Sequence, residues 1–313
     1  MRTFYNYIHE YLKIHFHWPL YVSFLIYISV LITMNYVFEI ETNQYQNLRG
    51  STYLILSFFA LNMLVYILAC LLQSMFTKNF EYLNNLNFWF TISFGFILLA
   101  LDRSFYVPQE FCLKIGIVFC SFWSLNAKYI FGLIIILLPF YVLYKMHSHK
   151  SMASFYGMDL HVSKMRSYFY VVPILVLIIL IGSYSKGFQS YYPFFSRTGY
   201  EGPLKYMGFS LTELIAIFES LYLMNFIKVE FFFRGFLVIG MMHFLKKDVI
   251  LPMVAVYVIL HFGKPVEETI TSAFGGFLIG IVAYYSKNIW GGIIWHISIA
   301  ASMEIFAYYQ KYL

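Results

Sequence analysis

Ionisable side chains lie inside apolar segments in the last third of this 313-residue chain. They are Glu219, Glu230, Arg234, His261, Lys264, Glu268, His296 and Glu304. An ionisable group inside such a segment is costly to bury, so each one marks a candidate functional site. Carboxylates and imidazoles also exchange protons near neutral pH. The set therefore predicts general acid–base chemistry on a water molecule.

The stretch KVEFFFRG places Glu230 and Arg234 four residues apart. Four residues are close to one helical turn, and Glu219 lies about three turns earlier, so all three share one predicted helix face. An arginine one turn from a carboxylate can keep the carboxylate ionised and fix its rotamer. A purely structural pair that holds helices together remains an alternative.

Glu230 and His261 lie at similar distances along the chain from the KKD motif at 246–248. If KKD joins two helices, the hairpin brings Glu230 and His261 to one depth, where they could polarise a water molecule together. The segment HFGKPVEE then adds Lys264, a proline and Glu268. A helix breaker among charged groups indicates the rim of a cavity.

His296 lies in WGGIIWHISIAASME, within the last predicted helix, and Glu304 ends that stretch. His296 could join the same cavity or be a packed core histidine, and Glu304 could join it or face water. The chain has no H-E-x-x-H, G-x-G-D or G-x-S-x-G motif. We therefore expect no cofactor, although a metal ion at the Glu/His cavity stays open.

The composition places these residues in a membrane protein. The chain is 61% hydrophobic and only 12% charged, whereas soluble domains are about one quarter charged. We expect an all-α, polytopic helical bundle with about eight or nine transmembrane helices in one integrated membrane domain. Residues 1–209 supply N-terminal helices without an assigned role, and 210–313 form the core with the site. The apolar runs are at about 18–38, 52–75, 87–101, 129–145, 167–184, 210–229, 249–263, 268–285 and 289–308.

The loops indicate how the chain is oriented. The most basic loop contains Lys145, Lys150, Lys164 and Arg166. The positive-inside tendency places this loop and KKD in the cytoplasm, and the loop with Glu39 and Glu41 and the 185–209 segment outside. The net charge of +6 fits anionic lipid rather than nucleic acid, because the basic residues are scattered.

Cysteine and loop histidines suggest no metal centre. Cys70, Cys112 and Cys120 form no C-x-x-C pair, so we expect buried free thiols. The loop histidines have no other ligands near them in sequence, and we expect them to be solvated. They are His147, His149 and His161.

The order of the motifs resembles the CPBP family of CAAX-processing and bacteriocin-processing membrane proteins, also called the Abi or type II CAAX protease family. Its usual motifs are Glu-Glu-x-x-x-Arg, a histidine that closes a helix, and His-x-x-x-Asn. Glu230, Arg234, His261 and His296 match within about 210–308. The resemblance implies that a glutamate and the first histidine activate water, and that the last histidine and the asparagine stabilise an oxyanion.

Two positions depart from that pattern. Val229 replaces the first glutamate and Ala300 the asparagine. Valine cannot accept a proton, and alanine cannot donate to an oxyanion. Glu230 could be the base instead, or Glu268 could enter the site from the following helix. The HFGKPVEE and HISIAASME strings resemble a bacterial branch of the family, which predicts a multi-pass protein of the bacterial inner membrane.

Three functions are compatible with this sequence. One is an intramembrane endopeptidase that cuts a membrane-proximal or lipidated peptide. The second is a catalytically inactive scaffold, chaperone or immunity protein that binds a partner in the same cavity. The third is a small transporter or lipid-handling protein, which the crowding of polar residues into one third of the chain disfavours. The expected partners are membrane lipid and a peptide or membrane protein, without nucleic acid.

Overall fold

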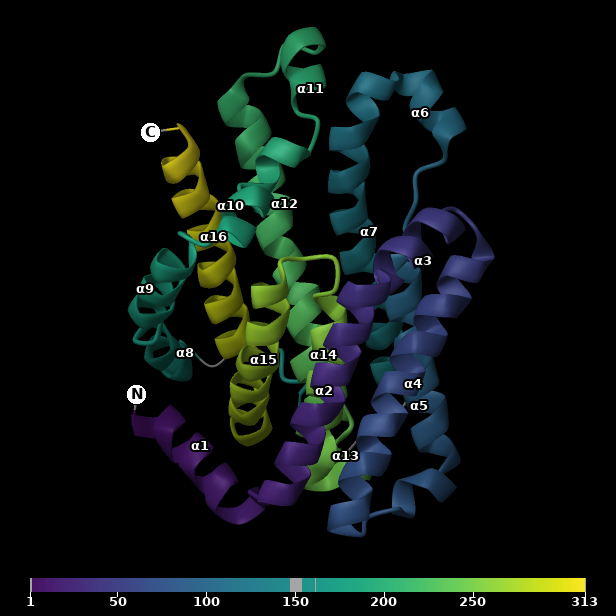
Figure 1. Cartoon of the computed structure of the whole chain (residues 1–313), viewed down its shortest axis with the longest axis vertical. Helices are drawn as coiled ribbons and strands as arrows, with labels where there is room; N and C mark the ends of the chain where they lie inside the picture. The colour runs from purple at the N-terminus through teal and green to yellow at the C-terminus, as the bar shows by residue number, and fades with distance from the viewer. Residues whose placement is uncertain (1, 147–153, 161, 313) are drawn as a thin grey trace.

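The computed structural model describes residues 2–146, 154–160 and 162–312. Within these ranges the regular structure is entirely helical, which confirms the expected class (Figure 1). The loop histidines His147, His149 and His161 lie outside the described residues.

Seven helical segments in the described ranges are long and apolar enough to cross a membrane. The chain is therefore a multi-pass integral membrane protein. The segments are Trp18–Phe38 (α2), Thr52–Thr77 (α4), Leu86–Arg103 (α5), Phe119–Met146 in α7 (Ile117–Met146), Met165–Gly182 across α8 (Val162–Phe169) and α9 (Val172–Gly182), Val266–Ser286 (α15) and Trp290–Tyr312 (α16).

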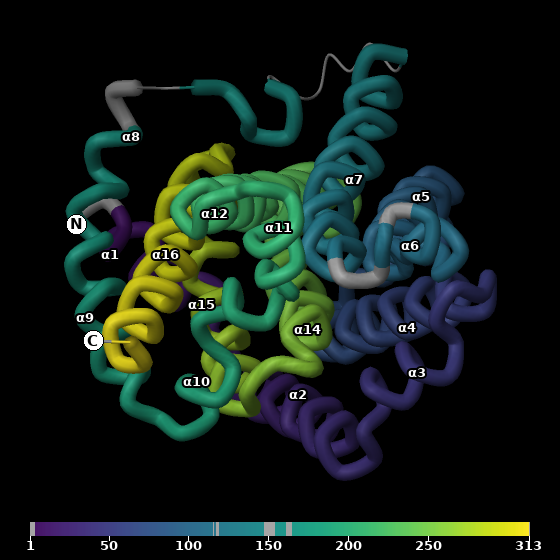
Figure 2. Tube along the Cα trace, turned by 90° about the horizontal axis from the view of Figure 1, so that it is seen from above, coloured from purple at the N-terminus to yellow at the C-terminus, as the bar shows by residue number. Residues whose placement is uncertain are grey.

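Two of the predicted apolar runs do not form such a span. Helix α12 (Leu211–Glu230) carries too many charged side chains, including Glu219 and Lys228. Helix α14 (Ile250–Leu260) has only 11 residues and is too short, since a span needs about 20 residues. Figure 2 shows α14 among the other helices of the bundle, and α12 between α16 and α7. Their nearest neighbours are α4, α7, α15 and α16.

Helix α12 begins with a capping box. The Ser210 hydroxyl accepts a hydrogen bond from the Glu213 amide, and the Glu213 carboxylate accepts one from the Ser210 amide. The Ser210 amide and the Ser210 hydroxyl both donate to the Glu213 carboxylate, and these two hydrogen bonds lower the pKa of Glu213. At its other end α12 continues into a π-helical segment, Phe231–Gly240, which contains Arg234. Such wider turns recur at functional sites.

The connecting segments separate into two ends of the bundle (Figure 1). One end has α3 (Ile40–Leu48), α6 (Gln109–Ile115), α10 (Lys186–Tyr191) and α11 (Glu201–Tyr206). The other end has α1 (Arg2–His15) and α13 (Met242–Leu245). Short 3-10 helices cover Glu81–Asn84, Phe194–Arg197 and Lys246–Val249. The loop with Glu39 and Glu41 and the 185–209 segment thus lie at one end of the bundle, and the KKD motif at 246–248 lies at the other end.

The prediction of three free thiols was wrong for two of them. Cys112 and Cys120 form a disulfide between α6 and α7. Gly116 lies between them with a φ of +96°, a conformation that glycine adopts without steric cost, and it reverses the chain so that the two cysteines meet. Cys70 is free and buried, as expected.

The arrangement of the ends yields a labelling prediction. Lys205→Cys should react with a membrane-impermeant maleimide in intact cells, and Lys247→Cys only after permeabilisation, because basic connections favour the cytoplasm. Both side chains are exposed. The unsubstituted protein is the control, since Cys70 is buried and the other two cysteines are bonded. The reverse labelling pattern would contradict the predicted orientation.

Candidate active site

The carboxylate of Glu230 is the centre of the candidate site. It ends α12 and its side chain is 0% exposed. One oxygen, Oε1, accepts a hydrogen bond from Arg234 Nη1 at 2.9 Å and another from His296 Nδ1 at 2.9 Å. Charge-assisted bonds of this kind are stronger than neutral ones. Three of the predicted residues, from α12, the π-helical segment and α16, therefore meet directly.

Gly292 makes room for this carboxylate. It lies four residues before His296 on α16, and a Cβ atom at this position would overlap the Oε2 atom of Glu230. A small residue at a helix contact lets a polar group of one helix approach the backbone of another. Within the described residues, Oε2 has no hydrogen-bond partner.

Tyr257 connects these groups to His261. Its ring lies 4.4 Å from the Arg234 guanidinium, and its hydroxyl is 3.4 Å from His296 Nε2. Its carbonyl oxygen is 2.9 Å from His261 Nδ1. Tyr257 is not among the residues predicted from the sequence. The available signal was its spacing, four residues before His261, which puts both side chains on one face of a helix.

The hydrogen bonds determine which nitrogen of each histidine carries the proton. A carbonyl oxygen only accepts, so His261 Nδ1 must donate to Tyr257. A carboxylate likewise accepts, so His296 Nδ1 donates to Glu230. In each neutral imidazole, Nε2 is left with a lone pair. Nε2 of His296 then accepts the 3.4 Å hydrogen bond from the Tyr257 hydroxyl. Both Nε2 atoms can accept a proton, that of His296 once this hydroxyl turns away.

Two cavities meet at these histidines. A polar cavity of about 280 Å³ lies toward α5 and α7, and an apolar one of about 440 Å³ lies toward α9 and α15. Glu230 lines neither of them. Some side chains line both cavities and form the junction between them. They are Tyr192, Tyr222, Phe226, His261, Lys264 and His296.

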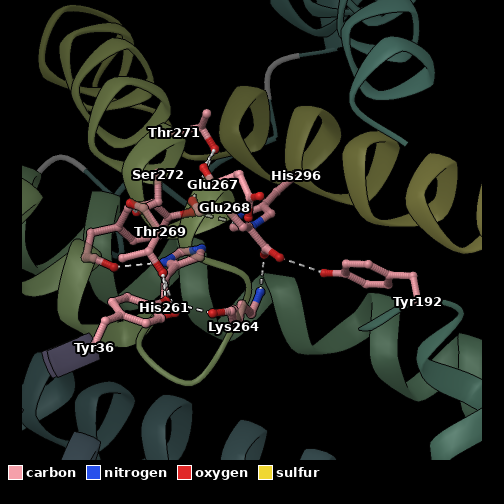
Figure 3. Close-up of polar contacts among 11 residues, drawn as sticks. Tyr36, Tyr192, His261, Lys264, Glu267, Glu268, Thr269, Thr271, Ser272 and His296 are labelled. Carbon is pink, nitrogen blue, oxygen red and sulfur yellow. Dashed lines mark hydrogen bonds and ion pairs between the residues drawn. The ribbon is translucent and has the colours of Figure 1, made fainter. Parts of the chain in front are cut away.

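Lys264 and Glu268 form an ion pair beside the junction (Figure 3). The Tyr192 hydroxyl donates to the other Glu268 oxygen at 3.0 Å. Lys264 lies in the turn between α14 and α15, and two hydrogen bonds hold this turn in place. Tyr36 donates to the Lys264 carbonyl at 2.6 Å, and Thr269 donates to the His261 carbonyl at 2.8 Å. Glu268 thus lies near the site on α15, with both carboxylate oxygens already bonded.

Glu219 and Glu304 do not join this group. Their carboxyl groups lie beside one another, and neither residue lines either cavity. Glu304 accepts hydrogen bonds from the backbone amides of Phe194 and Phe195, at 2.7 and 3.3 Å. Within the described residues, the pair holds the segment before α11 against α16.

The two positions that depart from the family pattern face the cavities. Val229 lines the polar cavity, and Ala300 lines the apolar cavity. Neither side chain brings a polar atom to the site. In the described part of the chain, no group of three or more His, Cys, Asp or Glu side chains could hold a metal ion.

The contact between Gly292 and Glu230 gives a stability prediction. Gly292→Ala should lower the free energy of unfolding by about 1–3 kcal/mol, because the added methyl group must displace the buried carboxylate. Gly275→Ala on α15 is the matched control, since its Cβ would meet no atom within 4 Å. Denaturant unfolding in detergent measures both variants. Equal stability of the two variants would refute the proposed close contact.

Comparison with known proteins gives one family match. No curated protein matches the chain, and no solved structure matches it. Residues 212–302 match the family model described as type II CAAX prenyl endopeptidase Rce1-like. The match covers α12, the π-helical segment, α14, α15 and most of α16, the elements that hold Glu230, Arg234, His261 and His296. This segment, residues 212–302, is a domain of the Rce1-like type II CAAX prenyl endopeptidase (CPBP) family.

Proposed function

We propose that this membrane protein is an intramembrane endopeptidase that hydrolyses a peptide bond in a membrane-proximal or lipidated substrate. The observation that carries the proposal is the position of the two histidines at the junction of the two cavities. Their Nδ1 atoms are occupied. Nε2 of His261 offers its lone pair, and Nε2 of His296 accepts only a long hydrogen bond of 3.4 Å from the Tyr257 hydroxyl, which a water molecule can replace. The family of the 212–302 domain supports the same reaction class.

In the proposed reaction, Nε2 of His261 or His296 accepts a proton from a water molecule while the water oxygen attacks the scissile carbonyl carbon. The tetrahedral intermediate then collapses, and the imidazolium returns the proton to the leaving amine. The Tyr257 hydroxyl donates to His296 Nε2 at 3.4 Å, and by turning away from that nitrogen it can donate to the oxyanion. This donor stands in for the amide that Ala300 lacks.

Glu230 acts in this scheme as a positioning residue. It holds His296 through Nδ1, and Arg234 keeps its charge balanced. The alternative in which Glu230 itself takes the proton from water has less support, because the carboxylate is 0% exposed and lines neither cavity. Glu230 therefore contributes orientation, and the imidazoles contribute the exchangeable proton site.

The apolar cavity suggests what kind of chain the site accepts. Its lining includes Ile178 and Ile179 of α9, Phe274 and Leu278 of α15, and Met303 of α16. Such a surface favours an acyl chain or an apolar peptide segment. His261 and Lys264 follow α14 at the end of the bundle that also contains α3 and α10. Since the positive-inside tendency puts this end outside the cytoplasm, we place the site toward the extracytoplasmic side.

Substitution of the histidines tests the endopeptidase. His261→Ala and His296→Ala should each lower the cleavage rate by about 10²-fold or more, because a positioned base contributes about 10²- to 10⁴-fold. New peptide termini in membrane fractions, quantified by mass spectrometry, provide the measurement. His243→Ala is the control, since His243 is exposed. Unchanged cleavage in both site variants, at equal protein levels, would exclude this mechanism.

A catalytically inactive scaffold or immunity protein is the second candidate. The observation that favours it is the loss of polar groups at Val229 and Ala300, both of which face the cavities. Under this function, a partner should co-purify equally with the wild type and with His261→Ala, and no new peptide termini should form. Cleavage that depends on His261 would rule it out.

A further inference from the structure

The polar cavity contains charged side chains that the proposed reaction does not use. Three helices outside the 212–302 domain bring them there: Glu41 on α3, Asp102 and Arg103 on α5, and Lys128 on α7. Charged groups within a helical bundle are costly and mark functional sites by default. The family domain alone therefore does not make this cavity.

The charges in and beside the cavity do not balance. Its lining has four cations, Arg103, Lys128, Lys228 and Lys264. Three of them have carboxylate partners: Arg103 pairs with Glu41, Lys228 with Asp102 and Lys264 with Glu268. Among the described residues, no hydrogen bond or ion pair is formed by the fourth cation, Lys128.

Lys128 lies next to one of these pairs. Lys228 Nζ donates to Asp102 Oδ1 at 2.6 Å, and this pair packs against Gly132, one turn after Lys128 on α7. Asn225 lines the same cavity, and its side-chain oxygen has no hydrogen-bond partner within the described part of the chain. Because an amide can be flipped, Asn225 can present its NH₂ group as a second donor.

We propose that Lys128 and the polar cavity bind one carboxylate of a substrate peptide, either its C-terminal carboxylate or an acidic side chain close to it. Asp102 and Glu41 attract Lys128 without forming an ion pair with it. The four cations and three carboxylates leave one excess positive charge, which complements a monoanion. The lining also includes Glu41 and Tyr45 of α3 and Tyr191 of α10, which lie at one end of the bundle, so the cavity is approached from the water-facing end. This subsite rests on the proposed function, since it assumes a peptide at the adjacent histidines.

The subsite also assigns a direction to the bound chain. The carboxylate lies in the polar cavity, the peptide passes the two histidines at the junction, and the apolar part occupies the cavity lined by α9, α15 and α16. The charged end and the apolar end are thus separated by the candidate catalytic groups. Lys128 becomes a specificity residue supplied by the N-terminal helices.

A pair of peptides tests this subsite. The probes are two copies of one dye-labelled apolar peptide, one with a free C-terminal carboxylate and one with a C-terminal amide. Binding to the full chain in phosphatidylcholine nanodiscs is measured by fluorescence anisotropy. The acid should bind about tenfold more tightly than the amide, as one charge-assisted hydrogen bond implies. Lys128→Met should abolish that difference.

Two further variants control the experiment. Lys128→Arg keeps the positive charge and should keep the preference for the acid. This variant tests the role of the charge even if Lys128→Met fails to fold. Lys145→Met removes an exposed lysine from the same helix and should leave the preference unchanged. Mass spectrometry of the recovered peptide records cleavage separately. A preference for the acid without cleavage would support the subsite while contradicting the endopeptidase.

Three results would overturn the subsite. They are equal affinity for acid and amide, a preference that survives Lys128→Met, and no binding of either peptide. Cleavage of both peptides at equal affinity would retain the endopeptidase and reject the subsite. Lys128-dependent co-purification of phosphatidylglycerol, without a difference between acid and amide, would assign the cavity to a lipid headgroup and also overturn the peptide subsite.

Discussion

The buried carboxylate of Glu230 ties the central helices to one another. Removing a carboxylate from water costs several kcal/mol, and only well-placed partners offset that cost. Here Arg234 and His296 both donate to a single oxygen, and the Arg234 guanidinium also lies over the Tyr257 ring. The end of α12, the π-helical segment, α14 and α16 must therefore keep their relative positions. Loss of Arg234 would leave the Glu230 carboxylate in the interior with only the hydrogen bond from His296.

The same interaction fixes the chemistry that the site can offer. Since Glu230 engages His296 Nδ1, and the Tyr257 carbonyl engages His261 Nδ1, both rings keep the lone pair on Nε2. In His296 this lone pair accepts a hydrogen bond from the Tyr257 hydroxyl. These bonds come from helices rather than loops, so the two rings are held by packed elements. Orientation of this kind is what a general base requires before its pKa matters.

Much of this site could be predicted from residue types and spacing, because ionisable groups in apolar segments have few roles. The expectation that Glu230, Arg234 and His296 share one site agrees with their contacts. Glu219 shows the limit. It shares a helix face with Glu230, but eleven residues of helix separate them by about 16 Å, and at that depth its neighbour is Glu304. Periodicity gives a direction around the helix, whereas the partner depends on tertiary packing.

Tertiary packing also explains what Val229 changes. In place of a glutamate, this chain has an apolar side chain in the polar cavity, and the preceding residue, Lys228, binds the Asp102 carboxylate of α5. The two carboxylates in that cavity, Asp102 and Glu41, thus come from distant helices and are already paired, which no pattern within 210–313 could indicate. In the proposed reaction, proton transfer at this site then depends on the imidazoles. Glu230 contributes by holding His296 in place, a role that does not require contact with water.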